Sequence, residues 1–133
     1  MELKKYVLLV ESNQIMVVGK DIVKREWEEK GKFYGEIIKK FEMWVVNDRW
    51  NYPLDYLDYK TSDNILDLVV VGDLVKVGTD SPNEVLALYD DEEFGKSATV
   101  SYYDYPFRLF WVTELFKKQP NGDYKRYEIG GEE

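Results

Sequence analysis

The stretch FKKQPNGDYKRYEI at residues 116–129 decides the class of fold that we expect. Its Asn121-Gly122 pair is favoured in tight hairpin turns, because such turns need a positive φ that Asn and Gly accept at low cost. We therefore predict that a turn at 120–123 joins a strand at 116–118 to a strand at 124–129. The chain should end in a β-hairpin.

Similar patterns lie near the start of the chain. Two short apolar runs, 5–10 and 14–18, are divided by the polar residues 11–13, which favours an opening hairpin. Residues 36–46 place Ile37, Phe41, Met43 and Val45 on one side, with Lys39 interrupting the apolar pattern. This period of two predicts a long, half-exposed strand.

Residues 21–30 leave two alternatives open. Asp21 could cap a helix in which Val23 and Trp27 share a face, with Gly31 after the last turn. The alternative is a strand through Val23 and Trp27 that turns at 30–32. We favour the helix and keep the strand as the competing interpretation.

The rest of the chain predicts short elements. Residues 47–60 contain many turn formers and read as a loop, and a helical turn at 62–68 could be capped by Ser62 or Asp63. Residues 107–116 are apolar on both faces until Glu114, which predicts a central strand. Further strands are expected at 73–77, 84–89 and 98–102, with a turn at 90–95.

About seven short strands without an alternating strand and helix rhythm predict a mainly β protein, with an α+β class as the alternative. We expect a single small antiparallel domain over residues 1–133, shaped as a partly open barrel or a curved sheet with one or two short helices. The Gly-Gly-Glu-Glu tail at 130–133 should be flexible.

The composition excludes several chemistries. The 133 residues contain no Cys and no His, so thiolate nucleophiles, disulfides, histidine general bases and the common zinc sites are absent. We predict no catalytic residues, no metal, no cofactor and no enzymatic activity. No apolar run approaches the length that spans a membrane, and the first residues lack a secretory layout, so we expect a soluble cytoplasmic protein.

The negative charge is localised. Eleven carboxylates and only two lysines lie between Pro53 and Lys96, an excess of nine against a net charge of −8 for the chain. Both flanks are therefore close to neutral. A localised field selects partners better than a uniform one, and its sign disfavours direct binding of nucleic acid.

Tyrosines and a tryptophan are interleaved with these carboxylates. Rings that anchor and acids that steer are suited to docking on a basic protein surface. The competing interpretations are loop aromatics folded over the core and a solvated turn at 90–93. The predicted partner-binding residues are Trp50, Tyr52, Asp55, Tyr56, Asp58, Tyr59, Asp90, Asp91, Glu92 and Glu93.

Two segments carry a resemblance. Residues 64–77, NILDLVVVGDLVKV, and residues 113–127, which begin Thr113-Glu114-Leu115-Phe116, resemble parts of small uncharacterised proteins encoded by bacteriophages and prophages. The resemblance implies an accessory phage protein that acts in a bacterial cytoplasm, with no catalytic residues carried over. We therefore expect a non-enzymatic protein that binds a basic surface of a host protein, in a sharper form a nucleic-acid mimic that inhibits a defence nuclease.

Two other functions remain as alternatives. A structural or assembly protein could form a homo-oligomer through an exposed sheet edge or through Tyr102, Tyr103 and Tyr105. A carboxylate-dependent, metal-assisted hydrolase would need several acids of one loop to converge. Its candidate residues are Asp55, Asp58, Asp63 and Asp67.

Overall fold

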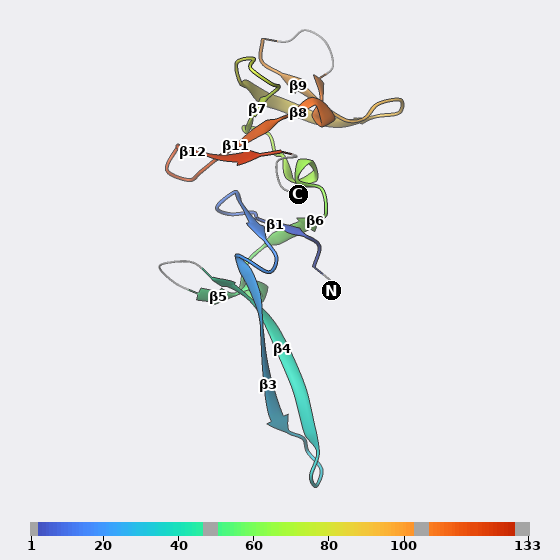
Figure 1. The fold of residues 1–133 in the computed structure, drawn as a ribbon, viewed down its shortest axis with the longest axis vertical. Helices are drawn as coiled ribbons and strands as arrows, with labels where there is room; N and C mark the ends of the chain where they lie inside the picture. The colour runs from blue at the N-terminus through green and yellow to red at the C-terminus, as the bar shows by residue number, and fades with distance from the viewer. Residues whose placement is uncertain (1–2, 47–50, 103–106, 130–133) are drawn as a thin grey trace. The chain divides into compact units, whose positions relative to one another are not determined.

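The computed structural model describes residues 3–46, 51–102 and 107–129. Its strands form three open antiparallel sheets, so the predicted mainly β class is confirmed (Figure 1). The chain divides into two compact units. The first unit runs to Asp63 without residues Ser12–Gln14, and the second contains Ser12–Gln14 and the chain from Asn64 onward.

The first unit contains two three-stranded sheets, one in the order β2-β1-β6 and one in the order β3-β4-β5. Their apolar residues meet in one core, where Val7, Ile22 and Val45 are fully buried. The elements are β1 Tyr6–Leu9, β2 Gln14–Val17, β3 Ile22–Lys30, β4 Ile37–Val46, β5 Asn51–Pro53, the 3₁₀ turn η1 Leu54–Tyr56 and β6 Tyr59–Ser62.

The predicted helix at 21–30 is wrong, and the competing strand is correct. Strand β3 pairs with β4 over nine positions, from Ile22 opposite Val45 to Lys30 opposite Ile37. Val23 and Trp27 are four residues apart, a spacing that puts two side chains on one face of a helix and also on one face of a strand. The spacing alone therefore could not distinguish the two structures.

The second unit contains one six-stranded sheet in the order β10-β9-β8-β7-β11-β12. Two 3₁₀ turns accompany it in the described part of this unit. The elements are η2 Ile65–Leu68, β7 Leu74–Lys76, β8 Asn83–Asp91, β9 Gly95–Val100, β10 Phe107–Arg108, η3 Leu109–Trp111, β11 Glu114–Lys118 and β12 Tyr124–Glu128.

The predicted C-terminal hairpin is confirmed as β11 and β12. Gly122 has a φ of 93°, as the Asn-Gly turn requires. The backbone N–H of Gln119 donates to the carbonyl of Asp123 at 2.7 Å and closes the turn. The opening hairpin and the strand at 36–46 are also present, as β1 with β2 and as β4.

Two local predictions need correction. Residues 107–116 do not form one strand, because the N–H of Val112 donates to the carbonyl of Leu109 and closes the turn η3 between β10 and β11. The helical turn after residue 62 is present, but Asn64 caps it by accepting from the N–H of Leu66. Asp63 instead accepts from the N–H of Lys5.

A buried ion pair joins the turn before β7 to strand β11 in the second unit. The side chains of Asp73 and Lys117 are both fully buried, and Lys117 Nζ lies 2.7 Å from Asp73 Oδ2. Asp73 also accepts from the N–H of Val70 and from Asn13 Nδ2, each at 2.9 Å. Lys117 donates further to the carbonyl of Leu68 at 2.6 Å. The carboxylate and the ammonium group are therefore well supplied with partners.

The prediction of a single domain over 1–133 stays a prediction. The predicted flexible tail at 130–133 lies outside the described residues. No helix in the described part of the chain is long and apolar enough to cross a membrane.

Candidate protein-binding surfaces

The predicted aromatic loop is ordered into β5, η1 and β6 of the first unit. Pro53 and Leu54 are buried there, and Leu54 belongs to the core cluster. They hold the short turn η1 against the core. Trp50, which we also assigned to this patch, lies outside the described residues.

The predicted binding residues of this loop differ in their exposure. Tyr56 is 78% exposed and Tyr52 is 42% exposed, so both rings offer surface to a partner. Asp55 and Asp58 are also exposed. Tyr59 is half-buried and packs against the core cluster, so the competing interpretation of a core-covering aromatic applies to it.

The four acids at 90–93 lie where β8 ends in the second unit: Asp90 and Asp91 are its last two residues, and Glu92 and Glu93 lie in the turn to β9. Asp91 has a structural role, because its Oδ1 accepts from the N–H groups of Glu93 and Phe94 at 2.8 and 3.1 Å. These hydrogen bonds, together with the nearby Arg108 guanidinium, lower the pKa of Asp91. Asp91 therefore shapes the turn and stays ionised in it.

The other three acids of this turn face solvent. Asp90, Glu92 and Glu93 are exposed, and none of them forms an ion pair with another residue that the structure describes. Asp90 stands opposite Lys96 in the register of β8 and β9, yet the ammonium group of Lys96 lies 3.5 Å from Asp67. We call Asp90, Glu92 and Glu93 the acidic turn.

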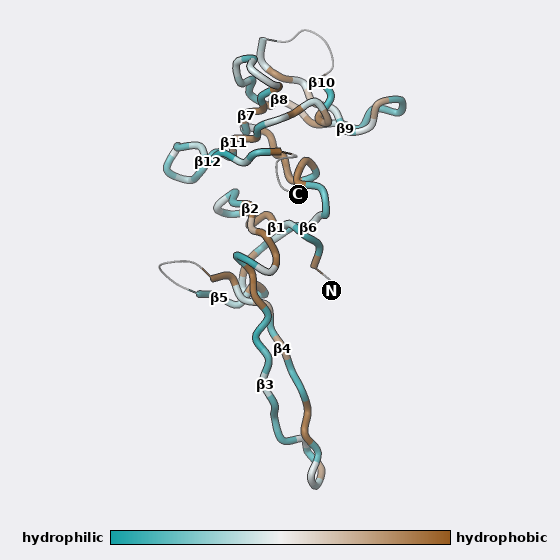
Figure 2. Tube along the Cα trace, viewed as in Figure 1, coloured by the Kyte–Doolittle hydropathy of each residue, from teal (hydrophilic) through white to brown (hydrophobic). Residues whose placement is uncertain are grey.

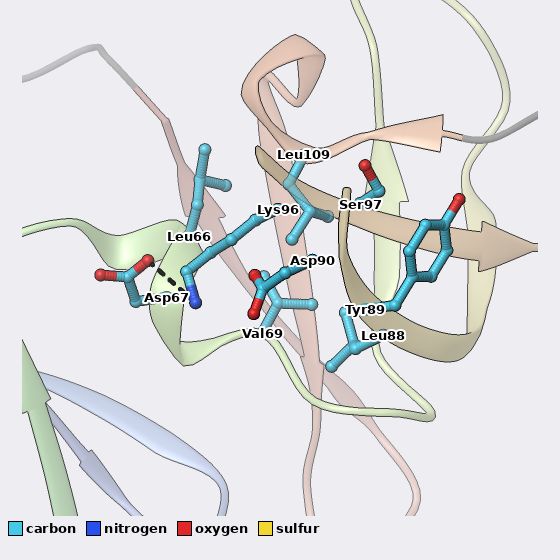
Figure 3. A pocket seen from close by; sticks show the side chains of 9 residues that line it. All are labelled: Leu66, Asp67, Val69, Leu88, Tyr89, Asp90, Lys96, Ser97 and Leu109. Carbon is cyan, nitrogen blue, oxygen red and sulfur yellow. Dashed lines mark ion pairs between the residues drawn. The ribbon is translucent and has the colours of Figure 1, made fainter. Parts of the chain in front are cut away.

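A hollow of about 180 Å³ opens beside the acidic turn, within the second unit (Figure 3). Figure 3 shows the ion pair of Lys96 and Asp67 next to the side chain of Asp90. The aliphatic residues that line the hollow come from η2, the segment after it, β8 and η3. They are Leu66, Val69, Leu88 and Leu109.

The charge excess belongs to the second unit. The sequence of the first unit contains 11 Lys and Arg against 12 Asp and Glu, a net charge of −1. The second unit contains 7 Lys and Arg against 14 Asp and Glu, a net charge of −7. The aromatic loop and the acidic turn, which the sequence placed in one charged segment, thus belong to different units.

The sequence prediction missed the most exposed apolar surface of the first unit. Strands β3 and β4 form a long two-stranded ribbon that extends beyond the rest of that unit (Figure 1). Only its root is buried, at Ile22 and Val45. We call β3, β4 and the connecting residues 31–36 the hairpin arm.

The shaft of the hairpin arm is held together by contacts between its own side chains. Lys40 forms an ion pair with Glu29 at 2.8 Å, and this contact lowers the pKa of Glu29. On the other face Lys24 lies over the ring of Phe41, with 4.6 Å to the ring centroid. The arm is therefore a regular hairpin with both faces largely in solvent.

The tip of the arm is more apolar than the shaft of β3. Figure 2 shows hydrophobic residues along β4 opposite the mostly hydrophilic β3. Phe33 is 77% exposed, Tyr34 is fully exposed and Ile37 is 64% exposed. The sequence contains a sign of this tip, the loop Lys-Gly-Lys-Phe-Tyr-Gly before a half-exposed strand. Because a helix was favoured at 21–30, this strand had no predicted partner with which to form a hairpin.

Two of the four carboxylates of the hydrolase alternative are engaged elsewhere. Asp63 accepts from the backbone of Lys5, and Asp67 pairs with Lys96. No group of three or more acids that could hold a metal ion occurs among the described residues.

Comparisons of the chain with known proteins found nothing similar. No family model matches the chain, and neither the curated proteins nor the solved structures gave a match. The case for a function therefore depends on the two surfaces themselves, the acidic second unit and the hairpin arm.

Proposed function

We propose that the chain is a non-enzymatic, phage-type accessory protein whose second unit binds a basic surface of a host protein. The observation that supports this proposal is the net charge of −7 on the second unit, against −1 on the first. An excess on one unit attracts a basic partner over a longer range than scattered pairs do and raises the rate of association.

The acidic turn supplies the contact point. Asp90, Glu92 and Glu93 are exposed and need not break an ion pair with a described residue before they meet a cation. Tyr89 and Phe94, which are 39% and 45% exposed, flank them with aromatic surface. Aromatic residues, tyrosine among them, are enriched in binding hot spots.

In its sharper form the proposal is mimicry of nucleic-acid charge. A partner with a basic groove, such as a defence nuclease, would take the second unit in place of a polyanion and lose access to its substrate. Such binding weakens steeply with salt, as binding of nucleic acid itself does. The proposed place of action is the cytoplasm of a bacterial host.

The test compares two triple variants in pull-downs from host extract. D90K/E92K/E93K reverses the acidic turn and spares Asp91, which the fold of the turn needs. E11K/D55K/D58K makes the same change in net charge in the first unit and includes two predicted binding residues of the aromatic loop. We expect the first variant to lose the basic partner and the second to keep it.

Competition distinguishes mimicry from other binding. A partner held by mimicry should be released by duplex DNA and by raised salt. A captured protein that resists both, or one that only the E11K/D55K/D58K variant loses, would overturn the proposal for the second unit.

A further inference from the structure

The tip of the hairpin arm has the character of a docking element. Phe33, Tyr34 and Ile37 expose most of their surface there, and Lys30 and Lys32 lie beside them in the sequence. An isolated two-stranded hairpin is marginally stable in water, and soluble proteins rarely leave contiguous apolar surface uncovered. A partner that covers the tip would therefore stabilise both the arm and the contact.

The loop geometry keeps these rings at the end of the arm. The N–H of Gly31 donates to the carbonyl of Glu36 at 2.9 Å, and the N–H of Glu36 donates to the carbonyl of Phe33 at 3.3 Å. Gly35 has a φ of 69°, a conformation that costs glycine little. The loop is thus closed by its own backbone, and Phe33 and Tyr34 lie within it with their side chains largely exposed.

The second unit has a hollow of matching size and chemistry. Its volume of about 180 Å³ is of the same order as the roughly 150 Å³ of an enclosed apolar cavity that binds benzene, but this hollow is open to solvent and lined by polar as well as apolar residues. Leu66, Leu88 and Leu109 are among its lining residues, and the carboxylates of Asp67 and Asp90 lie with them (Figure 3). A phenyl ring placed in the hollow would contact its leucines, and a lysine next to that ring would contact its carboxylates.

The charges of the two elements are complementary. Residues 22–46 carry six Lys and Arg and five Asp and Glu, a net charge of +1, whereas the second unit carries −7. The one ion pair drawn at the hollow, Lys96 with Asp67, is long at 3.5 Å and partly exposed, so a competing lysine can replace it at little cost. Asp90 is exposed beside it.

We propose that the arm tip of one copy of this chain docks in the hollow of a second copy, with the ring of Phe33 among the leucines and Lys32 next to Asp90. The occupant is a second copy because one chain supplies both halves, a basic aromatic tip and an acidic, ring-sized hollow. The contact joins two different surfaces, so it is head-to-tail and can extend into a ring or an open chain.

The experiment is sedimentation velocity of the purified full chain, with no host partner present, so its result does not depend on the function proposed above. Wild type should increase in mass with concentration up to about 1 mM, which corresponds to a weak but measurable contact. Added salt should reverse the increase. A chain that stays monomeric throughout would overturn the proposal and leave the tip to a foreign partner.

Two variants test where the two copies touch. Both replace charged residues by neutral ones, so neither introduces a charge that could form a new ion pair. K32S/F33S removes the tip, and L88Q/D90N alters the hollow. Each should be monomeric alone with an unchanged circular dichroism spectrum. Mixed in equal amounts they should form a dimer and nothing larger, because one variant keeps the hollow and the other keeps the arm.

A matched control and the remaining outcomes complete the test. I38S/K39S removes one lysine and one partly exposed apolar side chain from the shaft of the same arm and should associate like wild type. Loss of association in this control would contradict docking by the tip. A hollow variant that still associates alone would indicate contact between two arms, and a mixture that stays monomeric would show that the intact tip and the intact hollow do not bind each other. Either result would overturn the head-to-tail arrangement.

Discussion

The ammonium group of Lys117 lies 2.7 Å from the carboxylate of Asp73, and both side chains are fully buried in the second unit. Removing one partner of such a pair leaves a buried charge uncompensated. We predict that Lys117→Met lowers the free energy of unfolding by about 3–5 kcal/mol. Urea unfolding followed by circular dichroism measures this change.

The double variant K117M/D73N serves as the control, because it removes the stranded charge while the Asn oxygen can still accept from the N–H of Val70. It should recover part of the lost stability. Amide exchange at Val70 should quicken in K117M and return toward wild type in the double variant. A K117M protein as stable as wild type would contradict the importance of the pair.

Glu114 gives the second unit a dependence on pH. Lys76 and then Arg126 donate to its carboxylate and lower the pKa of Glu114. A carboxyl group whose pKa is lower in the folded state stabilises the fold at pH values above its pKa in the unfolded chain, about 4.3. This stabilisation is lost as the pH falls through the folded-state pKa. Glu114→Gln should therefore lower the melting temperature at neutral pH and have less effect at about pH 3.

Melting curves of wild type and E114Q between neutral and acid pH test this difference. Glu128 stands opposite Glu114 in the register of β11 and β12 and is much more exposed, so Glu128→Gln is the matched control. If the difference between wild type and E114Q stays constant over the whole pH range, the ion pairs of Glu114 do not contribute in the folded state.

The two ends of the hairpin arm should differ in their sensitivity to truncation. Ile22 is fully buried at the root, and Ile37 is 64% exposed at the tip. We expect Ile22→Ala to cost about 2–5 kcal/mol and Ile37→Ala less than about 0.5 kcal/mol. Urea unfolding at low protein concentration compares them, and equal costs would mean that the tip is covered in the monomer.

Asp91 can be tested through its two backbone hydrogen bonds. Asp91→Asn keeps an acceptor oxygen for the N–H groups of Glu93 and Phe94, whereas Asp91→Ala removes it. Exchange of these two amides should therefore be faster in D91A and close to wild type in D91N. Equal exchange in both variants would indicate that the turn keeps its shape without this acceptor.

Local signals predicted the fold well where one turn fixes the structure. The Asn121-Gly122 turn decides its own hairpin, because a positive φ and a closing hydrogen bond depend only on neighbouring residues. Strand β3 was kept only as the competing interpretation to a helix, because its partner β4 lies a loop away and the spacing of Val23 and Trp27 fits both structures. Its pairing is set by the tertiary structure.

For the candidate site, the sequence indicated which kinds of residue take part but not how they are arranged in space. All four acids at 90–93 were expected in a turn, but only Glu92 and Glu93 lie in it, because strand β8 continues through Asp91. Nothing in their sequence indicates that Asp91 accepts from the backbone. Lys117 falls in the predicted strand 116–118, and its complete burial is unexpected because lysine is rarely buried. Its position two residues after the buried Leu115 was the available signal, because both point to the same face of β11.

The uneven charge of the two units has a practical consequence for handling the protein. On a positively charged matrix, the second unit is strongly attracted while the first, with a net charge of −1, is hardly attracted at all. Adsorption should therefore take place through the second unit. A cationic sensor surface could capture the chain through this unit without a tag.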